Sequence, residues 1–161
     1  NKPIKERLIA NLIAFLLGGL ESSRLYDLLR IKKGLVYEID ANTHLGGKWG
    51  VLAISWACKE KNNSVIQDEI ISEINKLKKE GVSLKELKAA GKFLNMSDNK
   101  QFGNLEGLMQ WLTGDLLFEE KIYLPTEIEK IRNSITQKEI QKIANQIFDF
   151  DKVNIVTIRP R

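Results

Sequence analysis

Cysteine and histidine are almost absent from this chain of 161 residues, which holds one of each, Cys58 and His44. One cysteine excludes an internal disulfide framework and a Cys-x-x-Cys metal site. Hydrolytic zinc sites need two or three histidines with a carboxylate, so one histidine argues against such a site here. The two residues also fall at opposite ends of an expected hairpin, too far apart for a Cys–His dyad. We expect no bound metal and no complete catalytic site on this chain alone.

The sequence also lacks a long hydrophobic run and a concentrated patch of one charge. Its longest apolar stretch, Leu8–Leu20, is broken by one asparagine and two glycines. That stretch is shorter than the roughly 20 residues that span a bilayer, so we predict a buried helix and no membrane span. The net charge of +4 is small, and most lysines stand beside glutamates. A nucleic-acid surface would need a basic stripe with interleaved aromatic residues, so we predict no nucleic-acid partner.

Apolar residues at helical spacing predict a first helix over Ile4–Leu17. Gly18-Gly19 should end it in a left-handed conformation, which glycine adopts without strain. Either Ser22 or Ser23 can cap a second helix, which should end near Gly34.

Two extended segments, Leu35–Leu45 and Lys48–Cys58, flank Gly46-Gly47, a dipeptide typical of a two-residue hairpin turn. With Leu45 opposite Lys48, the register pairs Tyr37 with Trp56, Ile39 with Ile54, and Ala41 with Leu52. This register gathers apolar side chains on one face and polar ones on the other, which supports it.

The rest of the chain reads as helices followed by one strand. A helix should cover Leu105–Leu117, and Val153–Ile158 should form the last strand. Four capping boxes mark expected helix starts: Ser64 with Gln67, Ser83 with Glu86, Thr126 with Glu129, and Thr136 with Glu139. We predict one α+β domain over residues 1–161, an antiparallel sheet with a hairpin covered on one face by several helices.

Arg30 and Tyr37 are the candidate site residues, because both should lie beside one turn, at a helix end and a strand start. A guanidinium and a phenol there could donate to a peptide carbonyl, a carboxylate or an oxyanion. The structural alternative is an arginine bonded to helix-terminal carbonyls and a tyrosine filling the core. Strict alternation puts Tyr37 on the apolar face of Ile39. Either that face is accessible there, or a bulge turns the ring outward, or Tyr37 is a core residue.

These residues belong to a long ordered pattern that resembles a known family. Leu17–Leu25, Leu28–Arg30 and Lys33–Tyr37 are similar to the signature of the C-terminal domain of the insulinase, pitrilysin and mitochondrial-processing-peptidase family. The likeness extends over nearly the whole chain, through the hairpin and later helices. In two places the pattern departs: Leu20 replaces a usual glycine, and Ile31 replaces a frequent acidic residue.

The resemblance implies a substrate-binding, zinc-free half of a zinc metallopeptidase that hydrolyses peptides. In this family an N-terminal domain holds zinc in a His-x-x-Glu-His motif, and the C-terminal domain contributes an arginine and a tyrosine that bind substrate. Those positions match Arg30 and Tyr37. The expected partners are a peptide or protein substrate and a zinc-binding N-terminal domain or partner subunit, with the chain in a homo- or heterodimer. The alternative is a catalytically inactive core-type subunit that assembles a complex.

In this family a β-strand precedes the helix that here begins near Ile4, and Asn1 leaves no room for it. We therefore expect residues 1–161 to be a fragment of a longer protein. The sheet should be completed by a strand from elsewhere, or Lys48–Cys58 and Val153–Ile158 should pair directly, because open edges leave backbone groups without partners.

Overall fold

The computed structural model describes residues 3–45, 49–118 and 121–159. Its helices and strands follow in this order: α1 (Ile4–Gly18), the π-helix η1 (Tyr26–Lys32), β1 (Val36–Leu45), β2 (Gly50–Cys58), the 3₁₀ turn η2 (Glu60–Asn62), α2 (Asn63–Glu80), α3 (Leu84–Phe102), α4 (Leu105–Phe118), α5 (Pro125–Asn133), α6 (Gln137–Ile147) and the 3₁₀ turn η3 (Phe150–Lys152).

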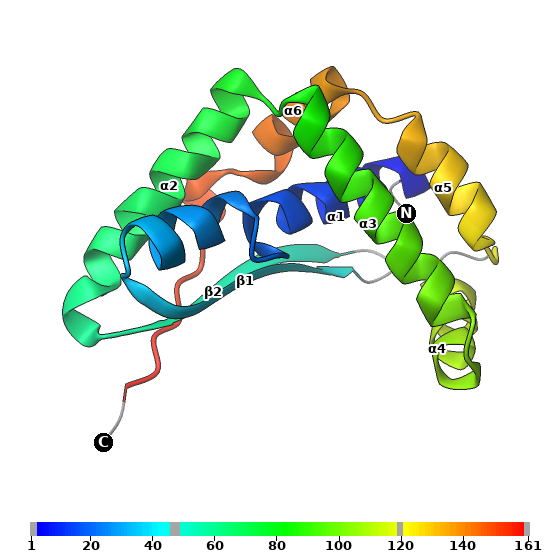
Figure 1. Ribbon diagram of the computed structural model, residues 1–161, viewed down its shortest axis with the longest axis horizontal. Coiled ribbons are helices and arrows are strands. Elements are labelled where there is room, and N and C mark those ends of the chain that lie inside the picture. Colours follow the sequence, from blue (N-terminus) through cyan, green and yellow to red (C-terminus); the bar gives the residue numbers. More distant parts are fainter. Residues whose placement is uncertain (1–2, 46–48, 119–120, 160–161) are drawn as a thin grey trace.

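Apart from α4, which lies beyond one end of the hairpin, the α-helices gather on one face of β1 and β2 (Figure 1). α1 lies directly on the hairpin, while α2, α3, α5 and α6 lie above it. On the opposite face, the described part of the chain provides no covering element. This confirms the predicted α+β class, with an antiparallel hairpin covered by helices on one side.

α1 forms the centre of the core. It is apolar on nearly all sides, and Leu12, Ile13 and Leu17 have no exposed surface. A helix that is hydrophobic all round must be buried all round. β1 packs below it, and α3, α5 and α6 pack around it. The prediction of a buried helix in the Leu8–Leu20 stretch is confirmed as far as Gly18, where α1 ends.

The reason expected for the end of α1 is wrong. Gly19 has φ −80° and is not left-handed. Gly18 instead permits close approach, since an added Cβ would lie 2.7 Å from both Cβ and the backbone nitrogen of Ala41. The serine caps are also wrong. The N-cap residue of η1 is Leu25, no side-chain hydrogen bond caps this helix, and among the described residues the buried Ser23 hydroxyl has no hydrogen-bond partner.

The hairpin forms, but its predicted register is wrong by two residues. Leu45 pairs with Gly50, Ile39 with Trp56 and Ala41 with Ile54. The expected turn at Gly46-Gly47 lies outside the described residues. Because side chains alternate with a period of two, a shift of two keeps the residues from Glu38 onward on their predicted faces. Ile39 and Ala41 are accordingly buried.

The expected last strand, Val153–Ile158, is not formed. These residues have no regular secondary structure, and their largest side chains are exposed, with Val156 86% and Ile158 94% accessible. Among the described residues the sheet has two strands, so direct pairing of this segment with the hairpin is wrong. An extended segment needs a neighbouring strand for its backbone groups, and apolar composition alone cannot supply one.

Two of the four predicted capping boxes are observed and two are not. Those of Ser83 with Glu86 and Thr136 with Glu139 form as predicted. Ser64 is not a cap, because η2 runs straight into α2, which begins at Asn63. Thr126 is not a cap either, because α5 begins one residue earlier at Pro125. There the Glu127 carboxylate accepts from the Leu124 N–H at 2.9 Å.

Candidate functional site

A β-bulge at the start of β1 decides where Tyr37 points. Val36 pairs with Cys58, but Glu38 pairs with Ala57, so Tyr37 is the extra residue. A bulge interrupts the alternation of side chains. Val36 and Ile39 are therefore both buried, and the Tyr37 side chain between them is 59% exposed. Of the three alternatives left open by the sequence, the core-filling tyrosine is excluded and the bulge is observed.

A π-helical segment positions Arg30. In η1 the Lys33 N–H donates to the Leu28 carbonyl at 3.1 Å, and the Leu35 N–H donates to the Leu29 carbonyl at 2.8 Å. Gly34 has φ +59°, the left-handed conformation that lets the chain reverse into β1. The fully buried Leu29 anchors the segment in the core, which leaves its neighbour Arg30 on the surface. Wide helical turns of this kind are frequent at functional sites.

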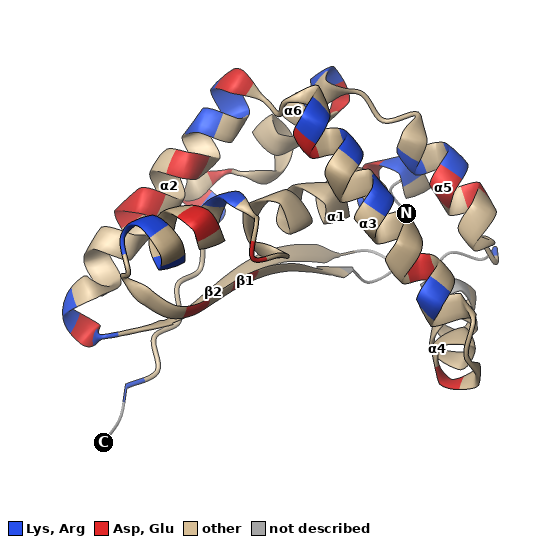
Figure 2. Cartoon of the chain, viewed as in Figure 1, with Lys and Arg blue, Asp and Glu red and all other residues tan. Residues whose placement is uncertain are grey.

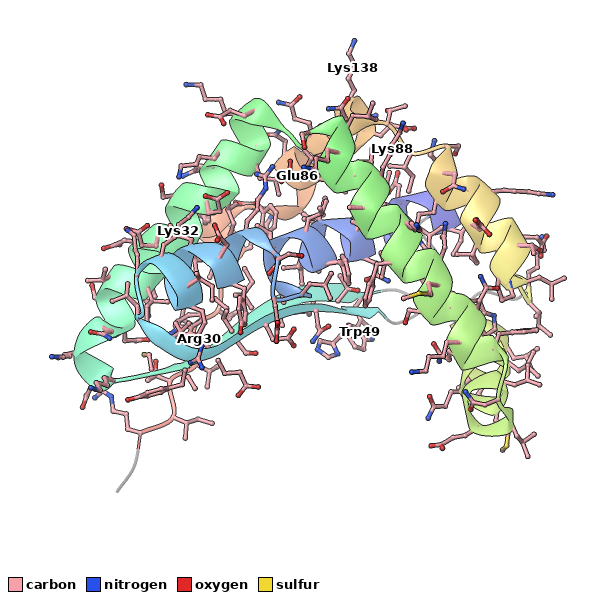
Figure 3. The ribbon with its side chains drawn as sticks, in the orientation of Figure 1. Arg30, Lys32, Trp49, Glu86, Lys88 and Lys138 are labelled. Carbon is pink, nitrogen blue, oxygen red and sulfur yellow. The ribbon has the colours of Figure 1, made fainter. Side chains whose placement is uncertain are left out.

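Arg30 reaches from η1 to the first residues of β1 (Figure 3). Its Nη1 donates to the Val36 carbonyl oxygen at 3.0 Å and also to the Tyr37 carbonyl oxygen. Arg30 thus holds the backbone on both sides of the bulge, whereas the structural alternative expected it on helix-terminal carbonyls. The N–H groups on Nε and Nη2 make no hydrogen bond with the described residues, so they stay available as donors.

Arg30 and Tyr37 line the same pocket, of about 500 Å³. Its other lining residues are Gly34, Leu35, Val36, Lys59, Lys61 and Asn62. The lining thus includes three cationic side chains and no carboxylate. Lys59 and Lys61 follow β2 in the sequence, and Figure 2 shows positive segments just after that strand. The pocket can therefore offer hydrogen-bond donors and positive charge to a ligand.

Sequence reasoning missed Lys59, Lys61 and Asn62 as members of this site. The lysines look ordinary in a chain with 25 lysines and arginines. The useful signal was their place immediately after β2, whose last residue pairs with Val36. Asn62 donates from Nδ2 to the Leu35 carbonyl at 3.2 Å, which fixes η2 beside the start of β1.

Among the described residues, neither His44 nor Cys58 belongs to a group that could hold a metal ion. His44 is exposed and pairs with Val51 near one end of the hairpin, while half-buried Cys58 pairs with Val36 at the other. Over residues 3–45, 49–118 and 121–159, no group of three or more His, Cys, Asp or Glu side chains could hold a metal ion. In those same ranges, no helix is long and apolar enough to cross a membrane.

Solved structures with the same fold include a protease from Helicobacter pylori, which aligns with 92% of this chain at a TM-score of 0.81 and 19% identity. A peptidase M16 inactive domain from Pseudomonas fluorescens aligns with 91% at a TM-score of 0.72 and 21% identity. This chain covers 36% and 35% of those two chains, about a third of their length. An inactive peptidase domain from Bordetella parapertussis aligns with 98% at a TM-score of 0.78 and 16% identity, and 86% of that chain is covered.

Comparison with curated proteins gives no match. The family model described as Peptidase M16 inactive domain matches residues 2–94. That range is more than half of the chain and contains α1, η1, the hairpin and both candidate residues. The chain therefore belongs to the Peptidase M16 inactive domain family.

Proposed function

We propose that this domain binds the peptide substrate of a zinc metallopeptidase through Arg30 and Tyr37, while another domain or subunit holds the zinc. The observation that carries the proposal is the bulge at Tyr37, secured by Arg30. It turns a large aromatic side chain out of the core and keeps it in one pocket with a guanidinium. Membership in a peptidase family supports the choice of a peptide as ligand.

The chemistry of the two side chains suits a peptide backbone. The Tyr37 phenol can donate to a carbonyl oxygen or to the oxyanion that forms from it. The remaining Arg30 donors are fixed in a plane and match carbonyl or carboxylate oxygens. A residue already bonded to the backbone loses less conformational freedom when it meets a ligand. Together they would orient the substrate and stabilise developing negative charge.

The zinc that the family implies does not fit this chain. The described residues offer no group of three metal ligands, and the sequence has a single histidine. The reaction steps at the metal therefore belong to whichever domain or subunit carries it. This domain would bind and orient the peptide and stabilise the negative charge that develops on it.

The test uses the intact peptidase, with this chain joined to its zinc-bearing domain or subunit. Arg30→Ala and Tyr37→Phe should each lower kcat by roughly ten- to a thousandfold, the scale for loss of one donor to a transition state. Tyr37→Phe changes a single exposed hydroxyl, so the stability of the fold should stay the same.

Two matched controls separate this role from a general effect of mutation. Tyr26→Phe removes a tyrosine hydroxyl from η1, outside the pocket lining, and Lys138→Ala removes an exposed cation from α6. Both variants should keep wild-type kcat. Full activity in both Arg30→Ala and Tyr37→Phe would contradict the proposal.

A structural role in an assembly is the second candidate, and α4 favours it. This helix leaves four large apolar side chains exposed: Leu105, Met109, Leu116 and Leu117. Apolar patches of this kind mark contact surfaces in soluble proteins. A catalytically inactive core-type subunit would need such a surface and would not need the Tyr37 hydroxyl. Full activity in both Arg30→Ala and Tyr37→Phe would therefore favour the assembly role over the substrate-binding role.

A further inference from the structure

We infer that the pocket beside Arg30 selects peptides that carry a carboxylate, through Lys59 and Lys61. This inference rests on the proposed function, because it names the substrate class of the same site. Arg30 and Tyr37 would bind groups found in every peptide, whereas the two lysines would favour an acidic side chain or a chain terminus.

The charge of the pocket is the first support. Arg30, Lys59 and Lys61 line it, and no aspartate or glutamate does. Glu60, which separates the lysines in sequence, pairs with Arg159 at 3.1 Å. Neither lysine has an ion pair or hydrogen bond with any described residue, in contrast to Lys33, which pairs with Glu69 at 2.5 Å. A carboxylate entering the pocket would meet positive charge that the protein does not itself neutralise.

The rigidity of the segment is the second support. Two side-chain hydrogen bonds hold η2 and the start of α2: Asn62 donates to the Leu35 carbonyl at 3.2 Å, and Trp56 Nε1 donates to Asn63 Oδ1 at 2.9 Å. The backbone that carries both lysines is therefore fixed against the start of β1. Lysines on a fixed backbone lose less freedom on binding a ligand than lysines on a mobile loop.

The expected gain in affinity is moderate, since both lysines are exposed. Exposed ion pairs contribute weakly and are screened by salt. Two such pairs should strengthen binding of a carboxylate about three- to tenfold at low ionic strength. The gain should shrink in about 0.5 M salt, where screening acts over a few ångströms.

The experiment titrates the ¹⁵N-labelled full chain with three capped model peptides and follows the backbone amide signals of Tyr37 and Asn62. The acidic peptide is acetyl-Ala-Ala-Glu-Ala-Ala-amide, and the neutral peptide replaces its Glu by Gln. The terminal peptide is the neutral sequence with a free carboxyl terminus. Comparing the acidic and terminal peptides distinguishes a side-chain carboxylate from a chain terminus.

We expect the acidic peptide, the terminal peptide or both to bind about three- to tenfold tighter than the neutral peptide. The double variant Lys59→Ala/Lys61→Ala should abolish that difference and leave neutral-peptide binding unchanged. Its matched control is Lys88→Ala/Lys138→Ala, which loses the same charge on the far side of the molecule from Arg30 (Figure 3). That control should keep the preference in full.

Failure of this inference and failure of the proposed function give different results. Equal binding of all three peptides at Tyr37 and Asn62 would overturn the role of the lysines and leave the peptide site intact. A preference that survives in Lys59→Ala/Lys61→Ala would also overturn it. If no peptide shifts either signal at millimolar concentration, both proposals are overturned.

Discussion

Arg30 donates from Nη1 to the carbonyl oxygen of Val36 at 3.0 Å, across the turn between η1 and β1. The same nitrogen also donates to the next carbonyl, that of Tyr37. One arginine on the helical segment thereby holds the bulged backbone that turns the tyrosine outward. The separation of seven residues between Arg30 and Tyr37 follows from this geometry, because η1 must end and reverse before β1 begins.

Two glycine-to-alanine changes should have opposite effects on stability, because Gly18 is in close contact with β1 and Gly91 is not crowded. Gly18→Ala would place a Cβ 2.7 Å from the backbone nitrogen of Ala41 and should destabilise the fold by about 1 to 3 kcal/mol. Gly91 lies inside α3, where an added Cβ meets nothing within 4 Å. Gly91→Ala should stabilise the fold by up to about 1 kcal/mol. Urea unfolding of both variants measures the two signs, and equal values would contradict this packing.

The buried ion pair between α5 and α3 predicts a large loss of stability. The Arg132 side chain is 3% exposed, and its Nη2 lies 2.7 Å from Asp98 Oδ2. Asp98→Ala would leave a buried guanidinium without its counter-charge, at a cost of about 3 kcal/mol. The exposed pair of Lys32 with Asp27, at 2.6 Å, is the matched control. Asp27→Ala should leave the urea midpoint unchanged. A similar loss of stability in both variants would contradict the prediction that the buried ion pair contributes more than the exposed one.

The Glu86 carboxylate predicts a loss of stability in acid. Burial alone would raise its pKa, but hydrogen bonds from Arg24, at 2.8 Å, and from Ser83 outweigh burial and hold the pKa at about 2. A carboxyl group with a pKa below its unfolded value stabilises the fold above that value. The contribution should be complete above about pH 4.5 and lost as the pH falls toward 2.

Because about a third of the Glu86 side chain is exposed, solvent screens its charge and its contribution to stability is about 1 kcal/mol. Glu86→Gln should remove that part of the pH dependence between pH 5 and 2, measured by urea unfolding across the range. Glu80→Gln, on the exposed end of α2, should leave the curve as in the wild type. Identical pH curves for wild type and Glu86→Gln would contradict the assignment.

Threonine-to-alanine changes test which helix starts are capped. The Thr136 hydroxyl accepts from the Glu139 N–H at 3.3 Å, so Thr136→Ala should cost about 1 kcal/mol. Thr126 lies within the first turn of α5 and caps nothing, so Thr126→Ala should change the free energy of unfolding by less than about 0.5 kcal/mol. Equal costs would contradict the observed starts of α5 and α6.

The sequence predicted what depends on local pattern. The bounds of α1 and α4, to within a residue, and the capping boxes at Ser83 and Thr136 follow from spacing and short-range hydrogen bonds. So do the faces of the hairpin residues beyond the bulge at Tyr37. Tertiary contacts set what it predicted wrongly. The need for glycine at position 18 comes from Ala41 in a distant strand, which no local pattern reveals.

Val153–Ile158 shows the same limit, because β-propensity describes side chains that fit a sheet and not the presence of a neighbouring strand.

The candidate site was partly visible in the sequence. Arg30 and Tyr37 were identified by their chemistry and family pattern, but the bulge that exposes Tyr37 was only one of three alternatives. The two lysines of the pocket were not identified, because only the folded backbone brings them beside Arg30.

Photocrosslinking tests the central claim, that Tyr37 contacts the peptide substrate, most directly. Benzoylphenylalanine is introduced at position 37 of the proposed peptidase. Position 96 on α3 is the control, because Met96 is 61% exposed and Tyr37 is 59% exposed. After irradiation with a peptide substrate, mass spectrometry should find the peptide attached at position 37 and not at position 96. Unlabelled substrate should compete with the attachment. Crosslinking at neither position, or equally at both, would contradict the account.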